Sequence, residues 1–312
     1  SRFDKTLKGV GITMEGTENN IVMYELLCEL PWHTAPINKA KWLENYTVAR
    51  YGKADESIQE AWKILSNSIY NCPPQSTQQG THESVFCARP SANAYQASSW
   101  SEMQDYYNPQ DVIQAAKLFL SAADKFKGNN NYEYDLVDIT RQALAEQGRL
   151  VHGVMKAAYK AREAKLFDET SQRFLRLILL QDELLATRSE FRVGNWIAQA
   201  RALGNTAEEK KLYEWNARTQ ISTWGNRYAA NNGGLHDYAH KEWNGILRDF
   251  YYKRWKTWVD ATNKELHGAP RQTIDWYALE EPWTLATNSY NAAAEGDCIE
   301  TARRILQDAT GK

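Results

Sequence analysis

The sequence predicts a mainly α-helical protein that begins with one strand–turn–helix unit. Amphipathic helical patterns cover almost all of the chain after about residue 37, with short polar breaks between them. The only good early strand candidate is the glycine-punctuated run 7–14, "LKGVGITM". No fixed-period repeat of the kind found in helical solenoids is present. These observations favour an all-α domain, residues 37–312, after a short unit, residues 1–36, that cannot form a fold by itself.

The N-terminal unit places one carboxylate at the end of its strand. Residues 7–14 lead directly into Glu15, and polar turn residues follow it. The run "NIVMYELLCEL", residues 20–30, then has helical character. The two prolines of "PWHTAP" break the pattern by residue 36.

Helix-start signals mark several elements of the large domain. Asn108 is a cap candidate, with Pro109 at the first helical position. Thr206 and Glu209 have the spacing of a capping box. One face of the earlier helix "ADESIQEAWKILSNSIY" carries apolar residues at helical spacing, namely Ile58, Trp62, Leu65 and Ile69.

The rest of the domain continues as helices, about eight to ten in the whole chain. Two helices are expected after residue 266. Helical patterns before that residue cover 108–126, 132–163, 168–188, 190–203, 205–224 and 235–266.

Composition and charge exclude several classes of protein. The formal net charge is −2, and the basic residues form no cluster, so a nucleic-acid partner is not expected. No apolar run approaches the ~20 residues needed to cross a bilayer. The first residues, "SRFDKTLK", resemble the interior of a protein, which suggests a fragment. The 12 Trp and 17 Tyr suit a helical core and also a carbohydrate ligand.

The four cysteines form no CxxC pair, so neither a zinc ribbon nor a redox motif is expected. Cys72 and Cys87 flank a loop rich in polar and turn-forming residues. The sequence leaves two interpretations open for them, a disulfide that closes this loop or two buried free thiols.

Glu15 is the first candidate for chemistry. A lone glutamate after a strand is most often a solvated loop residue. However, catalytic groups of α/β barrels lie at the C-terminal ends of strands. The glycines at positions 9, 11 and 16 also permit sharp turning around this carboxylate.

His236 and His240 are spaced i, i+4 on an expected helix, a spacing that can bind a metal. No third ligand is evident, and the glutamate that a zinc hydrolase carries beside its first histidine is missing. We therefore expect no metal and no cofactor. A metal-dependent helical hydrolase built on these two histidines is kept as a third hypothesis, which elemental analysis would test.

The loop in "STWGNRYAANNGGLHDYAH" is a candidate ligand-facing segment. It joins a helix that ends near Trp224 to one that begins near Tyr238. An indole offers a stacking face for a sugar ring and a phenol offers a hydroxyl group. The alternative is an ordinary helix–loop–helix with a tryptophan in the core.

Two further charged patterns are more simply structural. Asp138 and Arg141 are i, i+3 neighbours and predict a structural ion pair. The run "FYYKRWKTW", residues 250–258, predicts a helix face with cation–π contacts rather than a nucleic-acid platform.

Four motifs in order resemble one family, the α-N-acetylglucosaminidases of glycoside hydrolase family 89. They are "GVGITMEGTENNIVMYELLCELPW", "YDLVDITRQAL", "FRVGNWIAQARALG" and "TWGNRYAANNGGLHDYAHKEWNGILRDFYYKRW". The resemblance covers about residues 9–260 and is to the C-terminal part of the family. It implies that residues 1–36 are the last part of a catalytic (β/α)8 barrel and that residues 37–312 are the all-α C-terminal domain.

The resemblance also implies an activity and a site. The family hydrolyses terminal α-linked N-acetylglucosamine with retention, which needs a nucleophile and a general acid/base. The nucleophile corresponds to Glu15 in "TMEG", where Met14 replaces the proline of some relatives. The sugar-pocket residues of the all-α domain correspond to Trp224, Leu235 and Tyr238. The acid/base residue lies upstream of this chain in the family, so residues 1–312 alone are expected to be inactive.

The partners implied by the resemblance are the upstream barrel and N-terminal domain and a glycan with terminal α-N-acetylglucosamine. Relatives are exported in bacteria and lysosomal in animals. The alternative hypothesis is a non-catalytic helical module that binds carbohydrate or another protein. The two hypotheses differ in whether Glu15 faces a second carboxylate within an intact barrel.

Overall fold

The structure, a computed structural model, describes residues 9, 11–12, 20–73, 83–99 and 105–310. Within these residues the secondary structure is helical, and an isolated bridge between Arg192 and Asn244 is the only β-type pairing. The mainly α fold class is therefore confirmed. The α-helices in chain order are α1 Ile21–Glu29, α2 Lys39–Tyr51, α3 Glu56–Asn67, α4 Pro109–Ser121, α5 Ala123–Phe126, α6 Asn130–Ala161, α7 Ala164–Leu185, α8 Val193–Ala202, α9 Ala207–Gln220, α10 Tyr252–Leu266, α11 Trp276–Leu285 and α12 Cys298–Thr310.

Short helical turns of other types lie between these helices. Three are 3₁₀ turns, η1 Leu30–Trp32, η2 Val85–Cys87 and η3 Ser189–Phe191. Two are π-helical turns, η4 Tyr228–Asn232 and η5 Leu247–Tyr251. Turn η4 lies between Trp224 and Leu235, and turn η5 follows Tyr238 and continues directly into α10.

The expected N-terminal strand falls mostly outside the described residues. Of residues 7–14, the structure describes Gly9, Gly11 and Ile12, and none of the three is in a strand. The expected helix after the turn is present as α1. Its Glu29 carboxylate accepts a 2.6 Å hydrogen bond from the Trp42 indole of α2, so α1 is attached to the helical domain.

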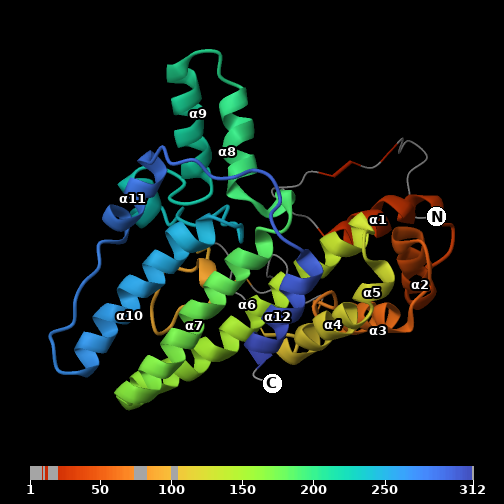
Figure 1. Cartoon of the computed structure of the whole chain (residues 1–312), viewed down its shortest axis with the longest axis horizontal. Helices are drawn as coiled ribbons and strands as arrows, with labels where there is room; N and C mark the ends of the chain where they lie inside the picture. The colour runs from red at the N-terminus through yellow and green to blue at the C-terminus, as the bar shows by residue number, and fades with distance from the viewer. Residues whose placement is uncertain (1–8, 10, 13–19, 74–82, 100–104, 311–312) are drawn as a thin grey trace.

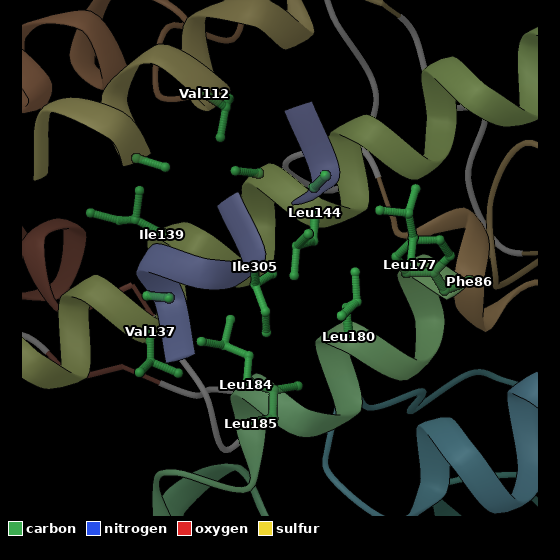
Figure 2. Close-up of a cluster of buried hydrophobic side chains, with 14 of the residues drawn as sticks. Phe86, Val112, Val137, Ile139, Leu144, Leu177, Leu180, Leu184, Leu185 and Ile305 are labelled. Carbon is green, nitrogen blue, oxygen red and sulfur yellow. The ribbon is translucent and has the colours of Figure 1, made fainter. Parts of the chain in front are cut away.

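The long helices α6 and α7 form the centre of the domain. They pack against each other, and Figure 1 shows them as a long neighbouring pair with α12 beside them. In the core close-up, Ile305 of α12 points between Leu144 of α6 and Leu184 of α7 (Figure 2). All three side chains are buried. The C-terminal helix therefore completes the core around this pair.

Helices α8 and α9 form a hairpin that projects from the main body, with α11 near its base (Figure 1).

The capping box predicted at the start of α9 is present, with both the Thr206 and the Glu209 side chains bonded to backbone N–H groups. The predicted Asn108 cap of α4 is also present, with Pro109 as the first helical residue. The apolar face predicted for α3 is buried.

Two expected helices are shorter than the sequence patterns indicated. The run 108–126 is divided into α4 and α5 at Ala122, whose amide bonds to Phe119 and Leu120 carbonyls. The run 235–266 is helical only from residue 247, because Asp237 and Gly245 have φ of +58° and +94°. A left-handed residue ends right-handed helical geometry. The expected helical spacing of His236 and His240 is therefore wrong.

All four cysteines are free thiols. Cys72 is exposed, whereas Cys87 is buried in the core. The structure thus has no disulfide across the loop between them, and only one of the two thiols is buried. In the described part of the chain, no helix has the length and apolar character needed to cross a bilayer.

Gly148 in α6 allows one close contact in the core. A Cβ atom at this position would lie 2.3 Å from Cε1 of Phe86, whose side chain is completely buried against Phe174. We expect Gly148→Ala to lower the free energy of unfolding by about 1–3 kcal/mol because the rigid phenyl ring has no free space to enter. Urea unfolding followed by circular dichroism measures this change.

Gly153→Ala is the matched control in the same helix. A Cβ atom there meets no heavy atom within 4 Å. The helix propensity of alanine should therefore raise stability by about 0.5–1 kcal/mol. Equal effects of the two substitutions would contradict the packing described for Phe86.

Candidate functional site

The expected sugar-pocket residues lie in the segment that joins α9 to α10. Trp224, Leu235 and Tyr238 are all in the described part of the chain, and none of them is in a helix. The helical ends expected near Trp224 and Tyr238 are therefore turns. Glu15, the expected nucleophile, lies outside the described residues.

Trp224 follows the last turn of α9, where the chain changes direction. Its φ is +61°, in the left-handed region that few L-residues adopt. Its amide donates to the Thr219 carbonyl at 2.7 Å, and the Ser222 hydroxyl donates to the Arg218 carbonyl at 2.6 Å. These bonds satisfy carbonyl groups at the helix end and leave Trp224 37% exposed.

Tyr238 lies directly beside Trp224 although the two residues are separated by a loop. Their ring centroids are 5.0 Å apart and the ring planes are inclined by 60°. The Tyr238 amide donates to the Leu235 carbonyl at 3.2 Å, which places Leu235 in the same turn. The structure thus brings the partly exposed indole of Trp224 into contact with the phenol of Tyr238, and Leu235 lies in the turn that leads to Tyr238.

Asp237, which directly precedes Tyr238, is a buried residue. Its side chain is completely buried, and its φ is +58°. Its amide donates to the Ser222 carbonyl at 2.8 Å, which joins the two ends of the segment. Its carboxylate accepts from His236 Nδ1 at 2.8 Å and from both terminal nitrogens of Arg254, at 2.9 and 3.1 Å.

Arg254 is buried in α10 and connects several parts of the chain. Its guanidinium lies over the rings of Phe250 and Tyr251, at 4.7 and 5.0 Å from their centroids. The cation–π face predicted for residues 250–258 is confirmed at this position. Arg254 Nη2 also donates to the Cys87 carbonyl at 2.5 Å.

Glu280 of α11 completes the buried network. Its Oε1 accepts from Arg254 Nη1 at 2.8 Å and from Arg89 Nε at 3.0 Å. Arg89 also donates to Glu280 Oε2 at 2.6 Å and to the Asn231 side chain at 2.9 Å. The network therefore joins the segment after η2, the loop before η5, α10 and α11.

The charges of this network stabilise one another. Burial opposes ionisation of Asp237, but Arg254 and His236 outweigh it and lower the pKa of the carboxyl group. Burial also opposes the charge of Arg254, but Asp237 and Glu280 outweigh it and raise the pKa of the guanidinium. Because each buried charge has a partner, loss of one of them would leave another uncompensated.

Both histidines have hydrogen-bond partners at Asp237. His236 bonds to the Asp237 carboxylate, and His240 Nδ1 lies 3.0 Å from the Asp237 carbonyl oxygen. Among the described residues, no group of three or more His, Cys, Asp or Glu side chains could hold a metal ion. The geometry gives the histidines structural partners instead.

A second ion cluster fixes the chain just after the site. Arg141 bonds to Asp138 at 2.9 Å, as predicted, and also pairs with Glu242. Gln181 of α7 donates to Glu242 at 2.6 Å. The ion pair is therefore structural, and it attaches the segment after Tyr238 to α6 and α7.

The sequence did not identify Asp237, Glu280 and Arg89 as part of the site. Arg254 was assigned to a helix face without its carboxylate partners. The one local signal was the position of Asp237 between two expected site features, His236 and Tyr238. The other partners come from helices distant in the sequence, so only the tertiary structure brings them together.

Comparisons with known families match both parts of the chain. The profile described as alpha-N-acetylglucosaminidase (NAGLU) C-terminal domain matches residues 42–308. The profile described as the tim-barrel domain of the same protein matches residues 1–34. Human alpha-N-acetylglucosaminidase is 31% identical over 310 residues, which are 97% of this chain and 40% of the human protein.

Solved structures of a family 89 glycoside hydrolase from Clostridium perfringens are also similar. The complex with PUGNAc has a TM-score of 0.88 and 35% identity over 92% of this chain and 33% of that chain. The same values hold for a form in which two glutamates are replaced by glutamine, in complex with its substrate GlcNAc-alpha-1,4-galactose. The chain therefore spans less than half the length of these relatives.

Proposed function

Because the chain belongs to the alpha-N-acetylglucosaminidase family, glycoside hydrolase family 89, we propose that it is the C-terminal part of a retaining glycoside hydrolase. The substrate would be a glycan with a terminal α-linked N-acetylglucosamine. The bacterial relative crystallised with GlcNAc-alpha-1,4-galactose supports this substrate class. Such an enzyme would act in the lysosome of an animal or outside the bacterial cytoplasm.

In this proposal, residues 1–36 complete a catalytic barrel and residues 37–312 form the helical domain packed against it. The two profile matches, over 1–34 and 42–308, support this division. Glu15 attacks the anomeric carbon while an upstream carboxylic acid protonates the departing oxygen. Water then hydrolyses the glycosyl–enzyme ester, with the same upstream group acting as base.

The observation that carries the proposal is the contact between Trp224 and Tyr238. These residues are 14 positions apart and in different turns, yet their ring centroids lie 5.0 Å apart beside a partly exposed indole surface. Leu235 lies in the turn that leads to Tyr238. In the proposed enzyme, these side chains form one wall of the pocket for the terminal sugar.

We expect Trp224→Ala in the full-length enzyme to lower kcat/KM about 10- to 100-fold, because the sugar loses its stacking contact with the indole. This loss corresponds to about 1.4–2.7 kcal/mol of transition-state stabilisation. Hydrolysis of p-nitrophenyl α-N-acetylglucosaminide measures this loss. Purified residues 1–312 alone should give no turnover, because the proposed acid/base group is upstream.

Trp215 of α9 supplies the matched control. It is 43% exposed, similar to Trp224, but it lies within α9 and lines a surface hollow with Leu285 and Thr287 rather than belonging to the segment 224–238. Trp215→Ala should leave kcat/KM within about two-fold. The proposal fails if Trp224→Ala is also without effect. Binding of the saccharide by a full-length protein that shows no hydrolysis would favour the non-catalytic module.

A further inference from the structure

The separation of Trp224 and Tyr238 depends on how the ends of their segment are held. Both ends contain a residue in the left-handed region, Trp224 with φ of +61° and Asp237 with φ of +58°. For residues other than glycine, this conformation costs of order 1 kcal/mol or more, and it persists where the surroundings enforce it. The 2.8 Å bond from the Asp237 amide to the Ser222 carbonyl is one such constraint.

The second constraint is the carboxylate of Asp237. It accepts from two nitrogens of Arg254, a paired geometry that fixes orientation as well as distance. Arg254 is itself held by the Cys87 carbonyl and by Glu280. The side chain next to Tyr238 is therefore attached to a buried and rigid part of the domain.

Buried ion pairs contribute little net stability compared with apolar side chains of similar volume. A gain in stability therefore does not explain why four charged residues, Asp237, Arg254, Glu280 and Arg89, are buried together here. Its other effect is geometric, because it fixes the residue that directly precedes Tyr238. We infer that Asp237, bound to Arg254 and through it to Glu280, is a positioning residue that sets the distance between Trp224 and Tyr238 and thereby the affinity for the sugar. This inference rests on the proposed function.

A matched buried pair elsewhere separates positioning from stability. Asp135 of α6 accepts from Arg50 at 2.5 and 2.8 Å and from the Tyr51 hydroxyl at 2.6 Å. Like Asp237, it is a buried carboxylate with a paired arginine and one further donor. Arg50 and Tyr51 lie on α2, which carries none of the proposed pocket residues.

The test uses the full-length enzyme and p-nitrophenyl α-N-acetylglucosaminide, at a temperature well below each variant's unfolding midpoint. Asp237→Asn should raise KM about 10- to 100-fold with kcat changed much less, because the lost interaction is one of ground-state sugar binding. Asp135→Asn should lower the unfolding midpoint by a similar amount but change KM by less than about two-fold. Equal changes of KM in the two variants would overturn the inference.

A double substitution tests whether Asp237 acts through the aromatic pair. If it does, Asp237→Asn should change KM by less than about two-fold in a Trp224→Ala background, because the positioned surface is already absent. If the two substitutions instead raise KM independently, so that their fold-changes multiply, the inference is overturned. Trp224→Ala without effect would instead overturn the proposed function, whatever Asp237→Asn does.

Glu280→Gln is the second variant, for use if Asp237→Asn does not fold. It weakens the support of Arg254 from α11 without changing any residue of the 224–238 segment. KM should rise about 3- to 10-fold with kcat retained. A fully folded Glu280→Gln enzyme with unchanged KM would count against the network as a positioning device.

Discussion

Glu15→Gln is expected to lower kcat for hydrolysis of an α-linked N-acetylglucosaminide about 10⁴-fold in the full-length enzyme. The reason is chemical, since a neutral amide cannot attack the anomeric carbon to form the glycosyl–enzyme ester. The geometric fit of the side chain is nearly unchanged, so KM should change much less than kcat. Initial rates with p-nitrophenyl α-N-acetylglucosaminide over a range of concentrations separate the two parameters.

Glu18 offers a matched control, because it is a second glutamate only three residues further along the same polar stretch. Glu18→Gln should retain kcat within about three-fold. Azide adds a test of the role itself. With Glu15→Gly, azide should enter from the face that the carboxylate leaves vacant and give the β-glycosyl azide, the inverted product. An α-glycosyl azide would assign Glu15 to the acid/base role and contradict the proposal.

His152 is expected to contribute about 3 kcal/mol to the free energy of unfolding of the 312-residue chain. This contribution is lost on acidification. This imidazole is buried beside Phe174 and Trp255, with Nε2 3.1 Å from the Ser91 carbonyl oxygen. Burial lowers its pKa from 6.5 to about 4. The Ser91 carbonyl opposes this shift, and Lys156 adds to it.

The sign follows from proton uptake. Between about pH 6.5 and pH 4 the unfolded chain binds a proton at His152, whereas the folded chain does not. Acidification through this window therefore favours the unfolded state. The contribution is complete above about pH 6.5 and is lost once the pH falls to about 4. Urea unfolding at a series of pH values measures it.

His152→Gln should flatten this part of the pH profile, because glutamine can still donate to the Ser91 carbonyl but does not titrate. His267→Gln is the control, since His267 is exposed and its Nδ1 lies 2.8 Å from the Asn263 carbonyl oxygen in the preceding helix α10. In this variant the free energy of unfolding should change with pH as steeply as in the parent chain. Identical slopes in all three proteins would show that the buried imidazole does not control this range.

The regular part of the fold could be predicted because its physical causes are local. The apolar face of α3, the Asn108 cap and the capping box of α9 each depend on residues within one or two helical turns. The prediction failed for residues 235–246, where the helical pattern continues but the chain turns. Here the amide of Asn244 bonds to the Phe191 carbonyl and that of Val193 to the Asn244 carbonyl, and these partners are about 50 positions away in sequence.

Only the partly exposed residues of the candidate site could be predicted from the sequence. The loop residues themselves pointed to Trp224 and Tyr238, and the resemblance to a family added Leu235; the structure brings the two aromatic rings into contact. The buried ion pairs beside them could not be predicted. The sequence of an amphipathic helix does not indicate whether an arginine in it is solvated or paired with a buried carboxylate. Arg254 and Asp237 are 17 positions apart, and Arg89 and Glu280 are 191 positions apart. Nothing at such separations can be recognised from local periodicity.

These separations also have a consequence for the order in which the chain folds. The Cys87 carbonyl accepts from Arg254, 167 positions later, and Arg89 pairs with Glu280, later still. Closing loops of this length carries a large entropic cost before the contacts can compensate for it, so such contacts form late. The contact between Trp224 and Tyr238 would therefore reach its final geometry only after α10 and α11 have been synthesised and docked. In the proposed enzyme, sugar binding would then report that folding of this domain has been completed.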